Sequence, residues 1–148
     1  MMTPPISQDQ LEAWVIAERA KVEAYLRKEK VDHLGVGDWP AYDDAPHIAI
    51  WAIQSKIKPG FVGWWSISGD CPTDYMSRGQ ADHPRKAILY FSESWKKTAE
   101  LMSAGKPNPE IRIGEKKDWP ILAPLLKSRS DFLDQLARDD DLWKEFTK

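Results

Sequence analysis

Apolar residues recur every three to four positions near the N-terminus, and this spacing predicts an amphipathic helix that ends near Lys30. Ser7 and Gln10 have the spacing of a capping box, in which the serine hydroxyl accepts the Gln10 amide and the glutamine side chain reaches back. Charged residues fall mostly between the apolar positions, on the opposite face of the helix. The recurring apolar residues are Leu11, Trp14, Val15, Val22, Tyr25 and Leu26.

The same period predicts a second helix over Pro84–Ala104, followed by Gly105 as a C-terminal stop. Its buried face is marked by Ile88, Phe91, Trp95, Ala99 and Met102. A further helical segment begins after Asp118, and Pro124 predicts that this helix is short or bent. Aspartates at positions 139–141 predict the cap of a last short helical turn.

Alternating residues over Phe61–Ser68 predict a strand, with Trp65 and Ile67 facing the core and Trp64 on the other side. Residues 110–113 alternate as well and predict an edge strand that pairs with it. The segment 46–57 leaves two alternatives, because its β-branched residues favour a strand whereas Pro46 and an apolar stripe favour a helix. The segment does not alternate polar and apolar residues, so we predict a helix. Residues 31–44 have the glycines and the Trp-Pro pair of a loop.

Together these elements predict a single α+β domain over residues 1–148. The fold is expected to be predominantly helical, with about four to five helices packed on a small two- to three-stranded antiparallel sheet. A chain of 148 residues with 42% hydrophobic residues is long enough to bury a core of its own.

Composition excludes several classes of function. The formal net charge is −2 and the basic residues are scattered, so a nucleic-acid partner is not expected. A single cysteine forms no internal disulfide, and no apolar run approaches the roughly 20 residues that cross a membrane. The first residues lack the features of a signal peptide. We therefore expect a cytoplasmic protein, a monomer or a small homo-oligomer, without a cofactor.

The segment Gly63–Tyr75 is the most unusual stretch of the chain, because a strand ends there in a Gly-Asp turn that holds out acids and hydroxyls. Loops at the end of a rigid strand often carry binding groups. The candidate binding residues are Trp64, Asp70, Thr73, Asp74 and Tyr75. The alternative is purely structural, since turns and helix caps select the same residue types.

His83 and Arg85 extend the candidate site, provided that the chain folds back on Asp70 and Asp74. Two acids, a histidine and a fixed cation are the ingredients of a small hydrolytic or acid-base enzyme. A divalent metal site built from Asp70, Asp74 and His83 is a weaker alternative, because no tight ligand spacing supports it. No nucleophile or metal constellation is complete, and this favours a non-enzymatic module that binds a protein partner or a small ligand.

The run from Gly-Trp-Trp at Gly63 through Asp74-Tyr75, with His83-Pro84-Arg85 after it, resembles an uncharacterised bacterial family described only as a domain of unknown function. The resemblance spans most of the chain. It implies a small bacterial cytosolic protein and carries no activity. An inhibitory or toxin-neutralising role is one form that the predicted binding function takes, since small rigid domains often act by steric and charge complementarity.

Overall fold

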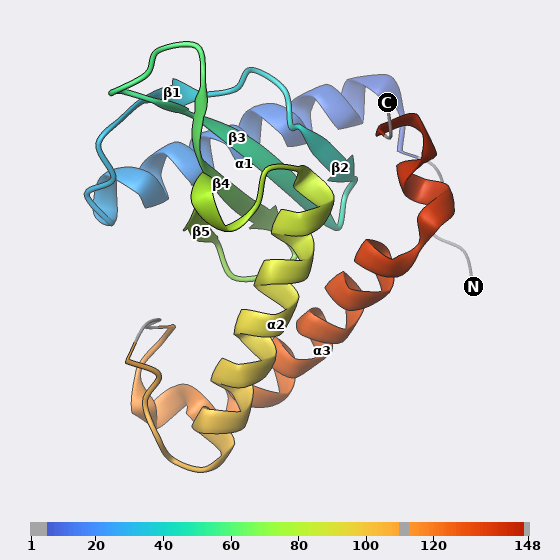
Figure 1. Ribbon diagram of the computed structural model, residues 1–148. Coiled ribbons are helices and arrows are strands. Elements are labelled where there is room, and N and C mark those ends of the chain that lie inside the picture. Colours follow the sequence, from blue (N-terminus) through green and yellow to red (C-terminus); the bar gives the residue numbers. More distant parts are fainter. Residues whose placement is uncertain (1–5, 110–112, 147–148) are drawn as a thin grey trace. The chain divides into compact units, whose positions relative to one another are not determined.

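The computed structural model describes residues 6–109 and 113–146 of the chain, which adopt an α+β fold (Figure 1). The chain divides into two compact units, Met1–Pro84 and Arg85–Lys148. The first unit contains a helix and the sheet, and the second contains two long helices. Each unit is described by itself.

The first unit is a five-stranded antiparallel sheet in the order β1-β3-β4-β5, with β2 paired to the same edge of β3 as β1. Its elements are α1 (Gln8–Lys28), β1 (His33–Val36), β2 (Tyr42–Asp44), β3 (Ile48–Ser55), β4 (Val62–Gly69) and β5 (Asp74–Ser77), followed by the 3-10 helix η1 (Arg78–Gln80). β3 and β4 are the central and longest strands, and the other three strands pair with one of them.

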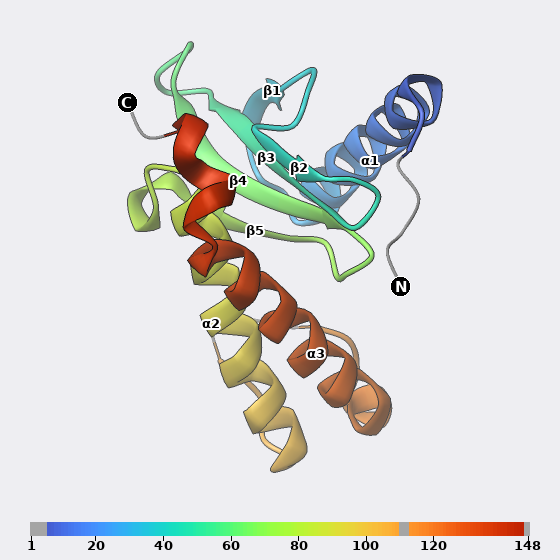
Figure 2. The same cartoon turned by 90° about the vertical axis from the view of Figure 1, so that its right-hand side faces the viewer.

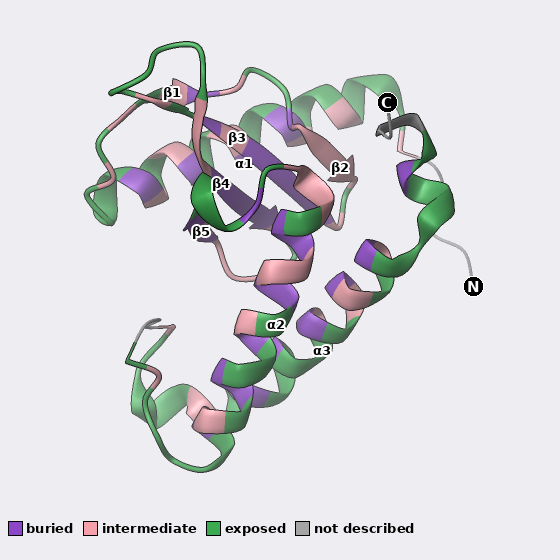
Figure 3. Ribbon diagram, viewed as in Figure 1, coloured by how far each residue is buried: buried purple, intermediate pink, exposed green. Residues whose placement is uncertain are grey.

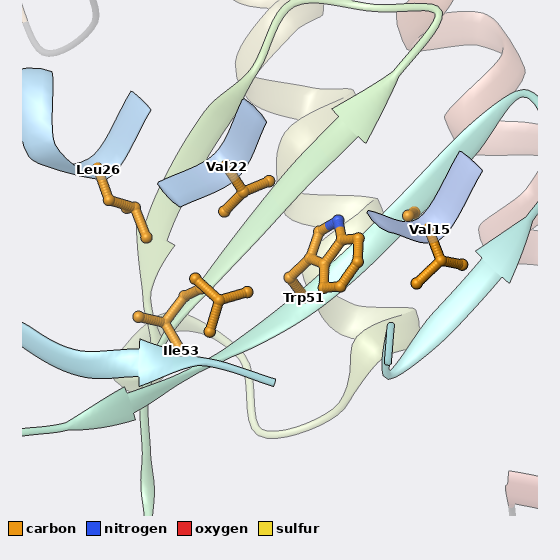
Figure 4. Packing of buried hydrophobic residues seen from close by; sticks show 7 residues of the cluster. Val15, Val22, Leu26, Trp51 and Ile53 are labelled. Atoms are coloured by element: carbon orange, nitrogen blue, oxygen red, sulfur yellow. The ribbon is translucent and has the colours of Figure 1, made fainter. Parts of the chain in front are cut away.

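Helix α1 begins as its sequence predicts and packs on one face of the sheet. The Ser7 side chain accepts the Gln10 amide, and the Gln10 side chain accepts the Ser7 amide, so the predicted capping box is confirmed. Figure 4 shows the cluster that α1 forms with the sheet. Its buried members are Val15, Val22, Leu26, Val36, Ala49, Trp51 and Ile53.

The prediction of a helix over residues 46–57 is wrong, because Ile48–Ser55 is strand β3. This strand is paired along both edges, and Ile48 to Trp51 are all buried. A strand buried on both faces shows no polar alternation, so its periodicity does not distinguish it from a helix. The apparent helix-start residues have another role: Asp43 and Asp44 lie in β2, and Pro46 follows a cis peptide bond in the turn to β3.

The predicted fold class is also wrong in its proportions. The described residues contain three α-helices and a five-stranded sheet, in place of four to five helices on two or three strands. The segment 31–44, predicted as a loop, contains β1 and β2. These strands have four and three residues, too few to establish an alternating pattern. The edge strand predicted at 110–113 falls largely on residues 110–112, which lie outside the described residues.

In the second unit two long helices lie side by side and antiparallel (Figures 1 and 2). They are α2 (Pro84–Ser103) and α3 (Trp119–Arg138), with the 3-10 helices η2 (Lys116–Asp118) and η3 (Asp140–Phe146) before and after α3. The Ser92 hydroxyl donates to the Ser130 carbonyl oxygen at 2.7 Å and joins the two helices. Pro124 neither shortens nor ends α3, which continues through it.

The buried faces of α2 and α3 follow the 3.6-residue period of their sequences, as the purple bands of Figure 3 show. The predicted bounds of the second helix are confirmed to within one residue at its C-terminal end, Ser103. No helix among the described residues is long and apolar enough to span a membrane.

Candidate functional site

The turn after β4 depends on Gly69. Its φ of +129° lies in a region that side-chain-bearing residues rarely adopt, and a Cβ built there would lie 2.2 Å from the His47 carbonyl oxygen. The Asp70 amide donates to the same oxygen at 2.8 Å. The β4–β5 turn therefore lies against the β2–β3 turn, with Asp70 exposed and Thr73 half-buried.

Asp74 is a buried carboxylate with structural partners. It is 8% exposed, and its Oδ1 accepts the Tyr75 amide at 2.8 Å. A hydrogen bond joins its carboxyl to the Tyr25 hydroxyl of α1. Burial and the nearby Asp74 charge raise the pKa of Tyr25 far above its ordinary value of 10.0. The Tyr25 and Tyr75 rings meet edge to face with centroids 6.0 Å apart, so Asp74 links β5 to α1.

Trp64 is half-buried and packs against the cluster beneath α1. It shares that sheet face with Ser66 and Ser68, both fully buried. The Ser68 hydroxyl accepts the Trp51 indole N–H at 3.0 Å, and the Ser66 hydroxyl donates to the Asp74 carbonyl oxygen at 2.7 Å. The face that holds Trp64 is therefore part of the core of the first unit.

The remaining predicted residues, His83 and Arg85, fall in different units of the chain. Arg85 belongs to the second unit, where its Nε donates to the Ala137 carbonyl oxygen at 2.6 Å and its Nη2 pairs with Asp140. His83 is half-buried, in the first unit, just before α2. Across the described ranges, no group of three or more His, Cys, Asp or Glu side chains is placed to hold a metal ion.

The comparison with protein families decides the affiliation of the chain. A family described as domain of unknown function DUF4826 matches residues 8–143. The chain belongs to this family. The resemblance to an uncharacterised family is thereby confirmed, and the description of the family names no activity. No curated protein and no solved structure matches the chain.

A second surface of this DUF4826 chain escaped the sequence prediction. The loop between β3 and β4, residues 56–61, is called the hairpin tip. Ile57 is 95% exposed and Phe61 is 63% exposed there, the former being the most exposed large hydrophobic side chain among the described residues. Two apolar side chains presented together on a turn are typical of a contact surface, whereas single exposed hydrophobic residues are ordinary.

The hairpin tip is held by its own hydrogen bonds. The Ser55 amide donates to the Phe61 carbonyl oxygen at 2.8 Å, and the Phe61 amide donates to the Lys58 carbonyl oxygen at 3.1 Å. The Lys58 amide donates to the Ser55 hydroxyl at 3.1 Å. Pro59 and Gly60, with φ of +90° at Gly60, fit the two central positions of a type II turn. The loop is therefore ordered before any partner binds.

The charge around the hairpin tip is mainly positive. The Lys58 ammonium lies 5.2 Å from the centre of the Phe61 ring, and Lys56 pairs with Asp32 at 3.1 Å. Strand β1 starts beside the tip, since His33 pairs with Ser55, and its Leu34 is 50% exposed. The sequence signal is present in Lys56-Ile57-Lys58-Pro59-Gly60-Phe61, but the helix predicted over residues 46–57 includes Ile57 and so conceals it.

A pH-dependent prediction concerns Asp43, which lies in β2 opposite Ala49. Burial raises the pKa of its carboxyl, the Asp44 charge raises it further, and a backbone hydrogen bond from Ala45 lowers it in part. The folded protein therefore binds this proton more tightly than the unfolded chain does. The free energy of unfolding falls as pH rises from the ordinary carboxyl pKa of 3.8 toward the raised folded value.

We expect Asp43→Asn to keep an acceptor for the Ala45 amide while removing the half-buried charge. Its melting temperature should exceed that of the wild type at pH 7 and match it at pH 3, where Asp43 is protonated in both states. Thermal unfolding at the two pH values measures this, with Glu93→Gln on exposed helix surface as the control. An equal gain at both pH values would show that the charge is not the cause.

Proposed function

We propose that this protein is a non-enzymatic binding module that uses the hairpin tip to dock on a protein partner. The observation that carries the proposal is the exposure of Ile57, at 95%, and of Phe61, at 63%, on an internally hydrogen-bonded turn. Interfaces derive most of their binding free energy from a few apolar or aromatic anchors that enter pockets on the partner. Ile57 and Phe61 are such anchors.

The order of the hairpin tip supports this function. A loop that is already fixed by hydrogen bonds loses little conformational entropy when it binds. Ser55 supplies two of these bonds, one through its amide and one through its hydroxyl. The turn projects from the two longest strands of the sheet, each of eight residues, so its base is rigid as well.

The charges define the partner. Lys58 follows Ile57 and lies over the Phe61 ring, whereas Lys56 is paired with Asp32, so the matching surface is an apolar depression with a carboxylate at the rim near Lys58. In an inhibitory or neutralising role, the module would bind an acidic protein surface of this kind. The acid-base enzyme has less support, because Asp74 is satisfied by Tyr25 and Tyr75, and Arg85 is bonded to Ala137 and Asp140.

The proposed function is tested by quantitative co-purification of the tagged full chain from the cells that make it. We expect the amount of partner that co-purifies with the double variant Ile57→Ser/Phe61→Ser to fall about tenfold or more, because the variant lacks both apolar anchors. Lys58→Glu should weaken binding and reduce its dependence on salt. All variants should keep the wild-type melting temperature, because the replaced side chains are exposed.

Matched controls make the result specific. Ile16→Ser and Ile121→Ser also replace exposed isoleucines, at 71% and 76% exposure, but elsewhere on the chain. These controls should retain the partner as the wild type does. Equal losses in control and tip variants would refute the proposal. So would flotation of the wild type, but not of the tip variant, with vesicles containing phosphatidylserine, because the tip would then serve a membrane.

A further inference from the structure

The second unit contains a pocket beside its two long helices. The hollow has a volume of about 610 Å³ and lies beside the C-terminal half of α2 and the start of α3. This volume lies within the range of about 300–1,000 Å³ that is usual for small-molecule sites. Met102 is its buried floor, and Pro107, Pro109, Ile113 and Trp119 complete the apolar lining. All these residues belong to the second unit.

Trp119 lines the pocket and carries an unsatisfied donor. The Trp119 Nε1 atom is shielded from solvent and has no hydrogen-bond partner among the described residues. Buried polar atoms are nearly always paired, so this indole N–H marks a position where an acceptor is missing. A second hollow, of about 440 Å³, also borders Trp119. A rotation of the Trp119 side chain, of the kind that commonly accompanies binding, would bring the indole N–H to one of these hollows.

The polar groups of the lining favour an anion. Lys116 and Glu115 both line the pocket, and the Glu115 carboxylate lies 3.5 Å from the Lys117 ammonium, which offsets its charge and leaves that of Lys116. The Asn108 amide donates to the Thr98 hydroxyl at 3.0 Å, and that hydroxyl donates to the Ser94 carbonyl oxygen at 2.8 Å, which fixes the wall opposite. The site thus combines an apolar body with two donors, Lys116 and Trp119.

We propose that this pocket binds a small amphipathic monocarboxylate. The hydrocarbon or aromatic body packs on Met102 and the two prolines. The Trp119 ring rotates so that the carboxylate accepts from its indole N–H and pairs with Lys116. The site is independent of the hairpin tip, because the two surfaces lie in different units and share no residue.

Octanoate is the probe. Octylamine is the matched control, since it also has eight carbons but its ammonium group accepts no hydrogen bond. In nitrogen-proton correlation spectra of the full chain, octanoate should move the Trp119 indole resonance. The resonances of Trp39, exposed in the first unit, and Trp143, bonded to the Leu136 carbonyl oxygen, should stay in place. Trp119→Phe removes the first resonance and so assigns it.

Two variants measure the contributions. Lys116→Glu should weaken octanoate binding about tenfold or more while leaving octylamine binding no weaker. Trp119→Phe should weaken it about fivefold to tenfold, the usual effect of one lost hydrogen bond. If Trp119→Phe does not fold, through-space contacts in the wild-type spectra assign the Trp119 resonance, and the octanoate shift and Lys116→Glu remain as tests. An unmoved Trp119 resonance at saturating octanoate, or equal affinities for octanoate and octylamine at that resonance, would overturn the proposal.

Discussion

Gly69→Ala should destabilise the protein by about 3 kcal/mol or more, because it combines an unfavourable backbone conformation with a steric clash. The φ of +129° at this position is one that alanine avoids. The added Cβ would lie 2.2 Å from the His47 carbonyl oxygen and 2.8 Å from the Ile48 Cα. Both are backbone atoms of the central strand region, so no side chain can move aside.

Urea denaturation of both proteins measures the loss. The matched control is Gly35→Ala, at a strand position where a Cβ would meet nothing within 4 Å. That variant should change the free energy of unfolding by about 1 kcal/mol or less. If Gly69→Ala proves as stable as Gly35→Ala, the close approach of the β4–β5 turn to His47 is wrong. The position proposed for Asp70 would be wrong with it.

Trp51→Ala should cost about 3–5 kcal/mol, the usual range for deleting a large buried aromatic side chain. Trp51 is fully buried between α1 and the sheet, where Val15, Val22 and Ile53 surround it (Figure 4). Its indole N–H donates to the Ser68 hydroxyl at 3.0 Å, so the substitution also leaves that hydroxyl without this donor. The effect combines a cavity with a lost hydrogen bond.

The control for this prediction is Trp39→Ala, since Trp39 is 46% exposed and lies outside the cluster. It should cost about 1 kcal/mol or less. The free energy of unfolding from urea titration, followed by far-ultraviolet circular dichroism, compares the two. A similar loss for both variants would contradict the assignment of Trp51 to the centre of the first unit.

Elements with a strong local signal could be predicted from the sequence. Helix α1 has a complete capping box at Ser7, and α2 keeps an unbroken apolar stripe up to Met102. The sequence of β4 alternates apolar and hydroxyl residues from Trp65 to Ser68, so the strand was predictable although both of its faces are buried. In each case neighbouring residues contain the whole signal.

Elements whose signal depends on distant partners could not be predicted. β3 is apolar on both faces because it lies between other strands, and a run such as Ile48–Trp51 is equally typical of a buried helix. The residues of β1 and β2 show no period of their own. These strands form because they pair with the edge of β3. Tertiary pairing therefore decided the structure of residues 33–55.

The candidate site shows the same division. The Gly69-Asp70 turn was evident from the sequence, but the role of Asp74 depends on Tyr25, which lies in a different element and is distant along the chain. Arg85 pairs with Asp140, 55 residues away. Such partners have no local signature. The hairpin tip did have one, in its Pro-Gly turn, but the exposure of Ile57 followed only once β3 was a strand.

Site-specific photo-crosslinking tests the central proposal, docking through the hairpin tip, most directly. A photoreactive phenylalanine analogue is placed in the full chain at position 57, at position 70 in the predicted β4–β5 turn, or at position 16 on α1. Illumination in the producing cells is followed by identification of the adducts. We predict one discrete protein adduct from position 57 that Lys58→Glu diminishes, with none from position 16. A discrete adduct from position 70 and none from position 57 would contradict the proposal.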